Sequence, residues 1–193
     1  MRLAEIDRGD SFGHRALIGF ISMVSGMRLP DAARVAFYHR EFLSGALGEW
    51  THETMRGESP WSISERELMA AMVATWNECP FCIGAHRAIA IKGMPRELAD
   101  TVLADYRAAP IPAGLKATLG FLETMTRTPE NLTPADARAA LEAGVTREAL
   151  DDAIAVATLF AIITRYANAL AFAIPTDAEF DKAATMLLKR GYR

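Results

Sequence analysis

The chain has 193 residues, of which 51% are hydrophobic and 23% charged. This is enough apolar material for a sizeable core, so we expect one domain, or two pseudo-repeated halves. The formal net charge is only -3 and Lys and Arg form no run, which gives no basis for nucleic-acid binding. The 2 cysteines are too few for a secreted disulfide scaffold and favour a reducing, cytoplasmic compartment.

Apolar residues recur at helical spacing along almost the whole chain. The first predicted helix runs from Ser11 to about Met27; its apolar part follows three acidic residues, which argues against a signal peptide. The second is predicted from Asp31 to about Trp50, with Gly57 in the loop that follows. The remaining predicted helices cover about 64–77, 81–92 (capped by a left-handed Gly93), 95–106, 113–127, 133–144, 146–173 and 177–190.

No stretch alternates apolar and polar residues as a half-buried strand does, so the sequence predicts an all-α fold. We expect a single all-helical domain with a helical extension over about 1–60. A core containing both cysteines follows over about 61–108, and a C-terminal helical half over about 112–193.

The predicted helix over 146–173 is apolar from Ala153 to Ile163, with Thr158 the one polar residue in that run. Arg165 and Asn168 interrupt it before the span of about 18 apolar residues that a membrane crossing needs. A helix that is apolar on all faces is buried in a core or an interface. We therefore predict a homo-oligomer, with this helix in the interface or in a core shared between subunits, and no membrane association.

A weak internal repeat is also visible. Aligning the segment that begins at Glu67 with the one that begins at Ala149 places Asn168 opposite His86. Neither cysteine has a cysteine counterpart, so only the first copy of such a pseudo-repeat retains thiol chemistry. Because both segments are alanine-rich helices, the match is weak support for a duplication.

The only cysteines of the chain, Cys79 and Cys82, form a Cys-Pro-Phe-Cys sequence with His86 four residues beyond. Residues four apart lie on one face of a helix, so His86 is expected directly above Cys82. An imidazole and the free amides of a helix start stabilise a thiolate, which makes Cys82 the candidate nucleophile. Cys79 is close enough to close a disulfide once Cys82 is oxidised.

Together with Glu67, this motif resembles a known family. Glu67, eleven residues, Cys79, two residues, Cys82, three residues and His86 resemble the core motif of the AhpD-like alkylhydroperoxidases, in the carboxymuconolactone decarboxylase superfamily. Arg66 before the glutamate and the Asn-x-Cys-x-Phe-Cys sequence resemble the peroxidase-related branch. The motif covers about twenty residues, and the all-helical prediction extends the agreement along the chain.

The resemblance implies an AhpD-like helical bundle, usually homo-oligomeric, that reduces a hydroperoxide without a cofactor and is regenerated by an external dithiol. Cys82 is then the attacking sulfur, Cys79 resolves the product as a disulfide, and Glu67 and His86 relay protons. The best-known members have a second histidine where this chain has Phe81. A phenyl ring moves no proton, so the resemblance here implies a relay that is shorter or runs through water.

This mechanism places a demand on the backbone. In one straight helix Glu67 and Cys82 would lie about 22 Å apart, too far for a proton relay. The chain must therefore bend between Asn77 and Pro80 and fold the two segments together, bringing Glu67 opposite His86. The structural alternative is that Glu67 caps its own helix by bonding back to the amide of Ser64.

Two other functions remain open. Cys79, Cys82 and His86 are three zinc ligands, but no fourth is apparent where a closed site needs four. The cysteine pair also suits a redox sensor that switches oligomer packing without turnover, and inert packing is a third reading of the two thiols. The lactone decarboxylase reaction is the less favoured enzymatic alternative.

Residues outside the motif are assigned no chemistry. We expect His14, His39 and His52 to be surface or packing residues. Trp76 and Phe81 are core residues that can also wall an apolar substrate pocket.

Overall fold

The computed structural model describes residues 1–38, 41 and 45–192. Within these ranges it contains eleven α-helices and no strand, so the all-α prediction is confirmed. The elements are α1 (Ala4–Arg8), α2 (Phe12–Ser25), α3 (Asp31–Tyr38), α4 (Leu47–Arg56), α5 (Ile63–Trp76), α6 (Pro80–Ala90), α7 (Arg96–Asp105), α8 (Ala113–Arg127), the 3-10 turn η2 (Pro129–Asn131), α9 (Pro134–Glu142), α10 (Arg147–Ala169) and α11 (Asp177–Arg190).

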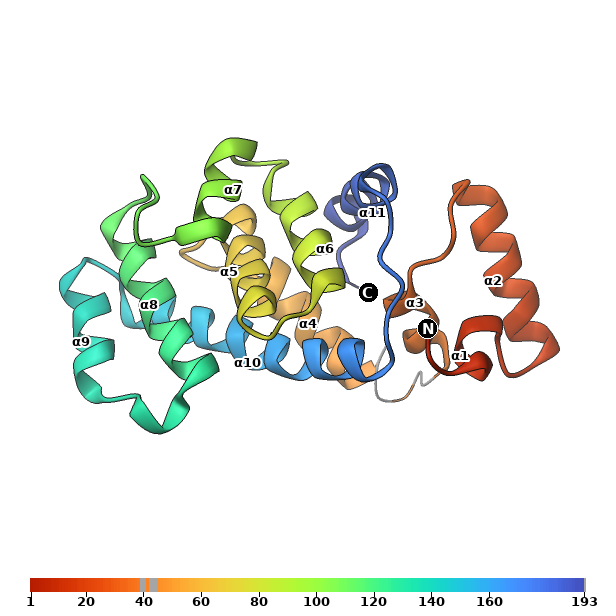
Figure 1. The fold of residues 1–193 in the computed structure, drawn as a ribbon, viewed down its shortest axis with the longest axis horizontal. Helices are drawn as coiled ribbons and strands as arrows, with labels where there is room; N and C mark the ends of the chain where they lie inside the picture. The colour runs from red at the N-terminus through yellow and green to blue at the C-terminus, as the bar shows by residue number, and fades with distance from the viewer. Residues whose placement is uncertain (39–40, 42–44, 193) are drawn as a thin grey trace.

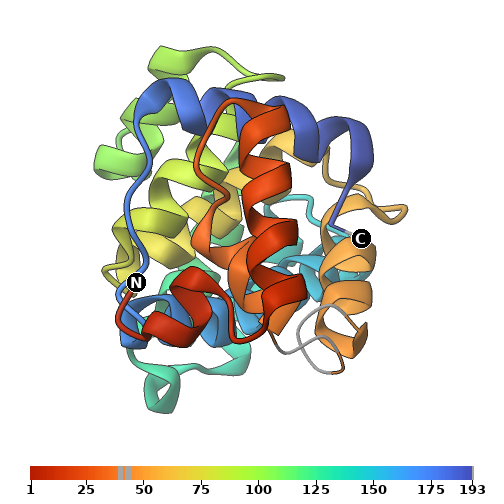
Figure 2. The ribbon, with the colours of Figure 1, turned by 90° about the vertical axis from the view of Figure 1, so that its right-hand side faces the viewer.

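Helices α5 and α6 lie side by side at the centre of the molecule, with α10 beneath them and α8 and α9 at one end (Figure 1). Helices α1, α2 and α3 form the opposite end, and α11 packs on α6 between them. Figure 2 shows this second end face-on, with α2 in front and α11 crossing above it. The segment with both cysteines is thus covered on several sides.

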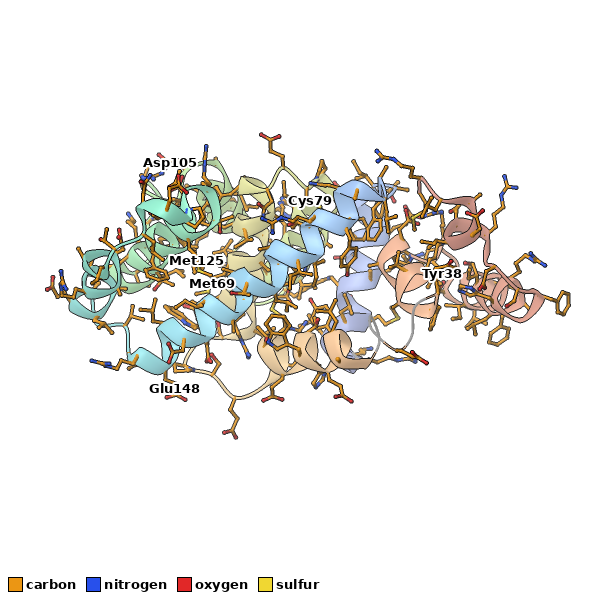
Figure 3. All side chains as sticks on the ribbon, turned by 90° about the horizontal axis from the view of Figure 1, so that it is seen from below. Tyr38, Met69, Cys79, Asp105, Met125 and Glu148 are labelled. Carbon is orange, nitrogen blue, oxygen red and sulfur yellow. The ribbon has the colours of Figure 1, made fainter. Side chains whose placement is uncertain are left out.

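The main core is built on α5, whose residues from Leu68 to Ala74 are all buried. Helix α10 crosses the lower face diagonally, from Glu148 at one end toward the region of Cys79 at the other (Figure 3). Its apolar run contributes Val156 and Phe160 to the core of the same chain, whereas Ile162 is 40% exposed. No helix in the described ranges is both long enough and apolar enough to span a bilayer.

The largest departure from the predicted helices lies between Asp31 and Gly57. Helix α3 ends at Tyr38, and α4 runs past the predicted end at Trp50 as far as Arg56. Gly57 ends α4, where an added Cβ would lie 2.5 Å from the carbonyl oxygen of Glu53. The part of the predicted helix at 39–40 and 42–44, with His39, lies outside the described residues.

Three smaller predictions are corrected. Gly93 does not have the positive φ of a left-handed cap; a Cβ there would collide with the Ser64 hydroxyl, so close approach explains the glycine. Helix α10 ends at Ala169 rather than near 173, and α1 was not predicted at all because it is so short. The pseudo-repeat has different structures in its two copies, because the part of α10 that aligns with the 77–80 turn is uninterrupted helix.

Candidate functional site

The turn between α5 and α6 places the two cysteines. Helix α5 ends at Trp76, Glu78 takes a left-handed φ of 50°, and Cys79 is the N-cap residue of α6. Pro80 occupies the first helical position, where the missing amide costs no hydrogen bond. The bend predicted between Asn77 and Pro80 is therefore confirmed.

A residue from α10 fixes this turn from outside. The side-chain amide of Asn168 donates hydrogen bonds to the carbonyl oxygens of Asn77, at 3.0 Å, and Glu78, at 3.3 Å. These carbonyls follow the end of α5 and have no partner within the helix, so the asparagine satisfies them. Asn168 is the residue that the weak repeat aligned with His86, and its function is to hold the motif's backbone.

The bend brings Glu67 of α5 opposite His86 of α6, as the resemblance required. The Nδ1 atom of His86 lies 2.6 Å from Oε2 of Glu67, and the carboxylate is 0% exposed. The ring of Phe160 packs edge-on against the imidazole at 4.3 Å between centroids. With Nδ1 engaged by the carboxylate, Nε2 is the imidazole nitrogen left to exchange a proton with a substrate.

Glu67 does not cap its helix. The capping box is made by Ser62 and Glu65, with the Ser62 amide donating to Glu65 at 2.8 Å and the Glu65 amide to Ser62 at 3.2 Å. The structural alternative for Glu67 is therefore wrong, because α5 begins at Ile63, earlier than predicted.

Two residues that sequence reasoning missed complete the surroundings of Glu67. Its second oxygen, Oε1, lies 2.7 Å from a guanidinium nitrogen of Arg56 and accepts a hydrogen bond from the Tyr192 hydroxyl at 2.9 Å. Burial alone would raise the pKa of Glu67, but the charge and hydrogen bond of His86, with those of Arg56, lower it below 4.5. Burial and the neighbouring Glu67 charge raise the pKa of Tyr192 well above 10.0, so it remains a donor.

Both cysteines are free thiols and each is 1% exposed. Interactions with the Cys82 thiol, and then with the Cys82 and Phe81 amides, outweigh burial and lower the pKa of Cys79 to about 7. The interaction with Cys79, together with burial, raises the pKa of Cys82. We therefore expect the first thiolate to form on Cys79 rather than on Cys82.

This order of ionisation is the reverse of the one expected from the sequence, where the helix-start amides were assigned to Cys82. That argument began the helix at Phe81, whereas α6 begins at Pro80 with Cys79 as its N-cap. As the N-cap residue, Cys79 rather than Cys82 lies at the positive end of the helix dipole, although its side chain makes no capping hydrogen bond. That Cys82 attacks the substrate stays a prediction, because transfer of one proton between the two sulfurs can make either of them the thiolate.

A pocket of about 300 Å³ lies beside the motif. Phe81 lines it, as predicted, and packs edge-on against Phe172 at 5.1 Å between ring centroids. Trp76 does not line it and instead packs against Tyr106 at 6.2 Å. The walls come from the start of α6 and from the end of α10 with the segment after it, among them Pro80, Phe81, Ala167, Asn168, Ala171 and Phe172.

The other predicted residues lie apart from this chemistry. His14 pairs with Asp10 at 3.0 Å, and Nδ1 of His52 accepts a hydrogen bond from the Tyr192 amide at 3.3 Å. His52 is therefore more than a packing residue, since it holds the segment that carries Tyr192. In the described part of the chain, no three or more His, Cys, Asp and Glu side chains are grouped to hold a metal ion.

The chain shares its all-α fold with AhpD-like, peroxidase-related proteins, which agrees with the resemblance of its motif. The chain is similar to the crystal structure of an uncharacterized peroxidase-related protein from Silicibacter sp. TM1040, with a TM-score of 0.77, 25% sequence identity and 93% of each chain covered. It is also similar to a peroxidase-related protein from Ralstonia eutropha JMP134, described as an alkylhydroperoxidase AhpD core. That match has a TM-score of 0.70 and 26% identity, over 89% of this chain and 88% of the other. No family model and no curated protein matches the sequence.

Proposed function

We propose that this protein is a thiol-dependent peroxidase that reduces an organic hydroperoxide or hydrogen peroxide through a Cys79–Cys82 dithiol/disulfide cycle. The observation that carries the proposal is the meeting of two pairs on α5 and α6. The cysteines lie together at the start of α6, at its N-cap and in its first turn, and one helical turn beyond Cys82 the imidazole of His86 is held by the buried Glu67. The similarity to peroxidase-related proteins supports the same reaction class.

The cycle begins with a thiolate on Cys79, a thiol on Cys82 and a protonated His86. The proton of Cys82 passes to Cys79 as the Cys82 sulfur attacks the peroxide oxygen. The O–O bond breaks, and His86 protonates the leaving oxygen to give the alcohol or water. Cys82 is now a sulfenic acid.

In the second half, the Cys79 sulfur attacks the sulfur of that sulfenic acid. Hydroxide leaves and takes up the proton of Cys79, giving water and the Cys79–Cys82 disulfide. The dithiol has then supplied two electrons to the peroxide. An external dithiol reductant restores both thiols by exchange.

His86 is near enough in the helix to serve the leaving oxygen at Cys82, which supports Cys82 as the attacking sulfur. The lowered pKa of Cys79 supports it as the base that first takes the proton of Cys82. No second histidine is needed in this scheme, and Phe81 instead lines the pocket next to the motif.

Stopped-flow mixing of pre-reduced protein with cumene hydroperoxide and with hydrogen peroxide, followed by thiol counting, tests the proposal. We expect loss of two thiols per chain. Cys82→Ser should abolish consumption, whereas Cys79→Ser should stop at a sulfenic acid. Reversed behaviour of the two variants would make Cys79 the attacking sulfur, and thiols left intact by both oxidants would refute the peroxidase.

A redox sensor without turnover is the second candidate, because both cysteines are only 1% exposed. A sensor is oxidised by a stoichiometric amount of peroxide, and with dithiothreitol and excess peroxide it adds little to the peroxide consumption of dithiothreitol alone. Repeated turnover under those conditions would exclude this alternative.

The remaining proposals concern partners and place. We propose a homo-oligomer that uses the outer face of α10, where Ile162 is exposed. The dithiol chemistry supports a reducing, cytoplasmic location and a cellular dithiol as the reductant. Sedimentation of the reduced and oxidised protein tests the first of these.

A further inference from the structure

We propose that Tyr192 is a positioning residue of this site, which acts with Arg56 as a clamp on Glu67 and so sets how tightly Glu67 holds the proton of His86. The inference rests on the proposed function, because it concerns proton delivery by His86 in that reaction. Neither residue belongs to the sequence motif, and both reach Glu67 from outside the helices that carry the motif.

The clamp divides the Glu67 carboxylate between two tasks. Oε2 faces His86 at 2.6 Å, while Oε1 is held by Arg56 at 2.7 Å and by the Tyr192 hydroxyl at 2.9 Å. A carboxylate with both oxygens engaged cannot rotate without breaking a charge-assisted hydrogen bond. The orientation of the His86 imidazole is therefore fixed through Glu67.

The segment that carries Tyr192 is shaped to dock on α4. Gly191 follows α11 with φ 68°, a left-handed conformation, and an added Cβ would collide with the imidazole of His52. His52 accepts the Tyr192 amide, and the guanidinium of Arg56 lies 4.8 Å from the centroid of the Tyr192 ring. Only a glycine fits at position 191. Together with the hydrogen bond from the Tyr192 amide and the cation–π contact, it directs the phenol to Glu67.

The charged and titratable groups that face Glu67 are few. His86 approaches from α6, Arg56 from α4 and Tyr192 from the segment after α11. Arg66, on α5 itself, also interacts electrostatically with Glu67, but its guanidinium is bonded to the carbonyls of Thr54 and Gly57. Removing the phenol therefore removes one of the two donors on Oε1 and leaves the charge balance of the cluster unchanged.

A carboxylate that loses a donor keeps more negative charge for its remaining partners. Without the phenol, Glu67 holds the proton of His86 more tightly. Proton transfer to the leaving oxygen then slows, and the alkaline limb of the pH–rate profile moves to higher pH. A residue that only stabilises the fold would lower the amount of active protein without moving that limb.

The test compares Tyr192→Phe with a matched control, Tyr106→Phe. The control removes a similar phenol-to-carboxylate hydrogen bond, 2.7 Å long, from Tyr106 to Glu123, outside the Glu67 cluster. Full-length protein labelled with 15N-histidine is examined by NMR; the chain has 4 histidines, and His86→Gln assigns the Nδ1–H resonance of His86. The pH–rate profile with cumene hydroperoxide is measured on the same samples.

In Tyr192→Phe we expect the Nδ1–H resonance to shift and its exchange with water to change. We also expect kcat/KM to fall about tenfold, the scale of one hydrogen bond to a charged group, and the alkaline limb to move upward. Tyr106→Phe should match the wild type in all three. An unchanged resonance and limb in Tyr192→Phe would overturn the proposal. A wild-type protein that consumes no peroxide would refute the proposed function, while the NMR comparison would still decide whether Tyr192 positions the pair.

Discussion

Replacing Glu67 by glutamine tests the buried cluster most directly. The side chain is fully buried and serves three partners: His86, Arg56 and the Tyr192 hydroxyl. Glutamine keeps the size but not the charge, so Arg56, whose side chain is only 7% exposed, is left as an uncompensated buried cation. Breaking a buried ion pair in this way costs about 3–5 kcal/mol.

Urea denaturation followed by circular dichroism measures this loss, and Arg56→Met provides the second edge of a double-mutant cycle. With both members of the ion pair replaced, the guanidinium of Arg56 is no longer present as an unpaired buried charge. We therefore expect the Glu67→Gln, Arg56→Met protein to be less destabilised than the sum of the two single variants. A loss below about 1 kcal/mol for Glu67→Gln, with additive single effects, would refute the reasoning that the pair is buried and mutually compensated.

Three further predictions follow from the same contacts. Titration of the thiolate absorbance should show one thiolate appearing near pH 7, lost in Cys79→Ser, because the Cys79 pKa is lowered to about 7; a single transition near 9 would contradict it. Asn168→Ala removes two hydrogen bonds from the motif's turn and should cost about 1–3 kcal/mol by urea denaturation, with faster amide exchange at 77–79; unchanged exchange there would count against it. Folding lowers the pKa of Glu67 from 4.5, so its contribution to the free energy of unfolding is present above about pH 4.5 and is lost as the pH falls below that value. The Glu67→Gln variant lacks this contribution, so its free energy of unfolding should fall less than that of the wild type as the pH is lowered through this range; an equal fall in both proteins would contradict the prediction.

The helices and the central pairing were predictable from the sequence because they depend on local patterns. Apolar spacing located most of the helices, and proline chemistry located the bend at 77–80. The demand that Glu67 meet His86 came from the resemblance, which placed both residues in one proton relay, together with helix geometry, and the structure confirms it at 2.6 Å. Such inferences need only the rise and the turn of a helix.

The contacts from distant segments were beyond the reach of those patterns. Arg56 was missed because the second helix was expected to end at Trp50, which removed Arg56 from any helix face. Tyr192 meets Glu67 across 125 positions of sequence, and a single aromatic residue after a helix carries no periodic signal. The expected pKa order of the cysteines depended on one residue of the helix boundary, because a helix that starts at Pro80 makes Cys79 its N-cap. Helix ends are the least certain part of such predictions.

The enclosure of both sulfurs, each 1% exposed, gives the two halves of the proposed cycle different steric demands. A peroxide is small enough to travel along the walls of a pocket, whereas a dithiol carried on a protein must bring its own sulfur into contact with the disulfide. Because neither cysteine lines the neighbouring pocket, reduction by such a partner requires a larger opening at the start of α6 than oxidation by a small peroxide does. Reduction of the disulfide should therefore be more sensitive than oxidation to changes that weaken the hydrogen bonds from Asn168 to the turn. On this reasoning, the backbone of the motif helps to select the reductant, as its thiols do.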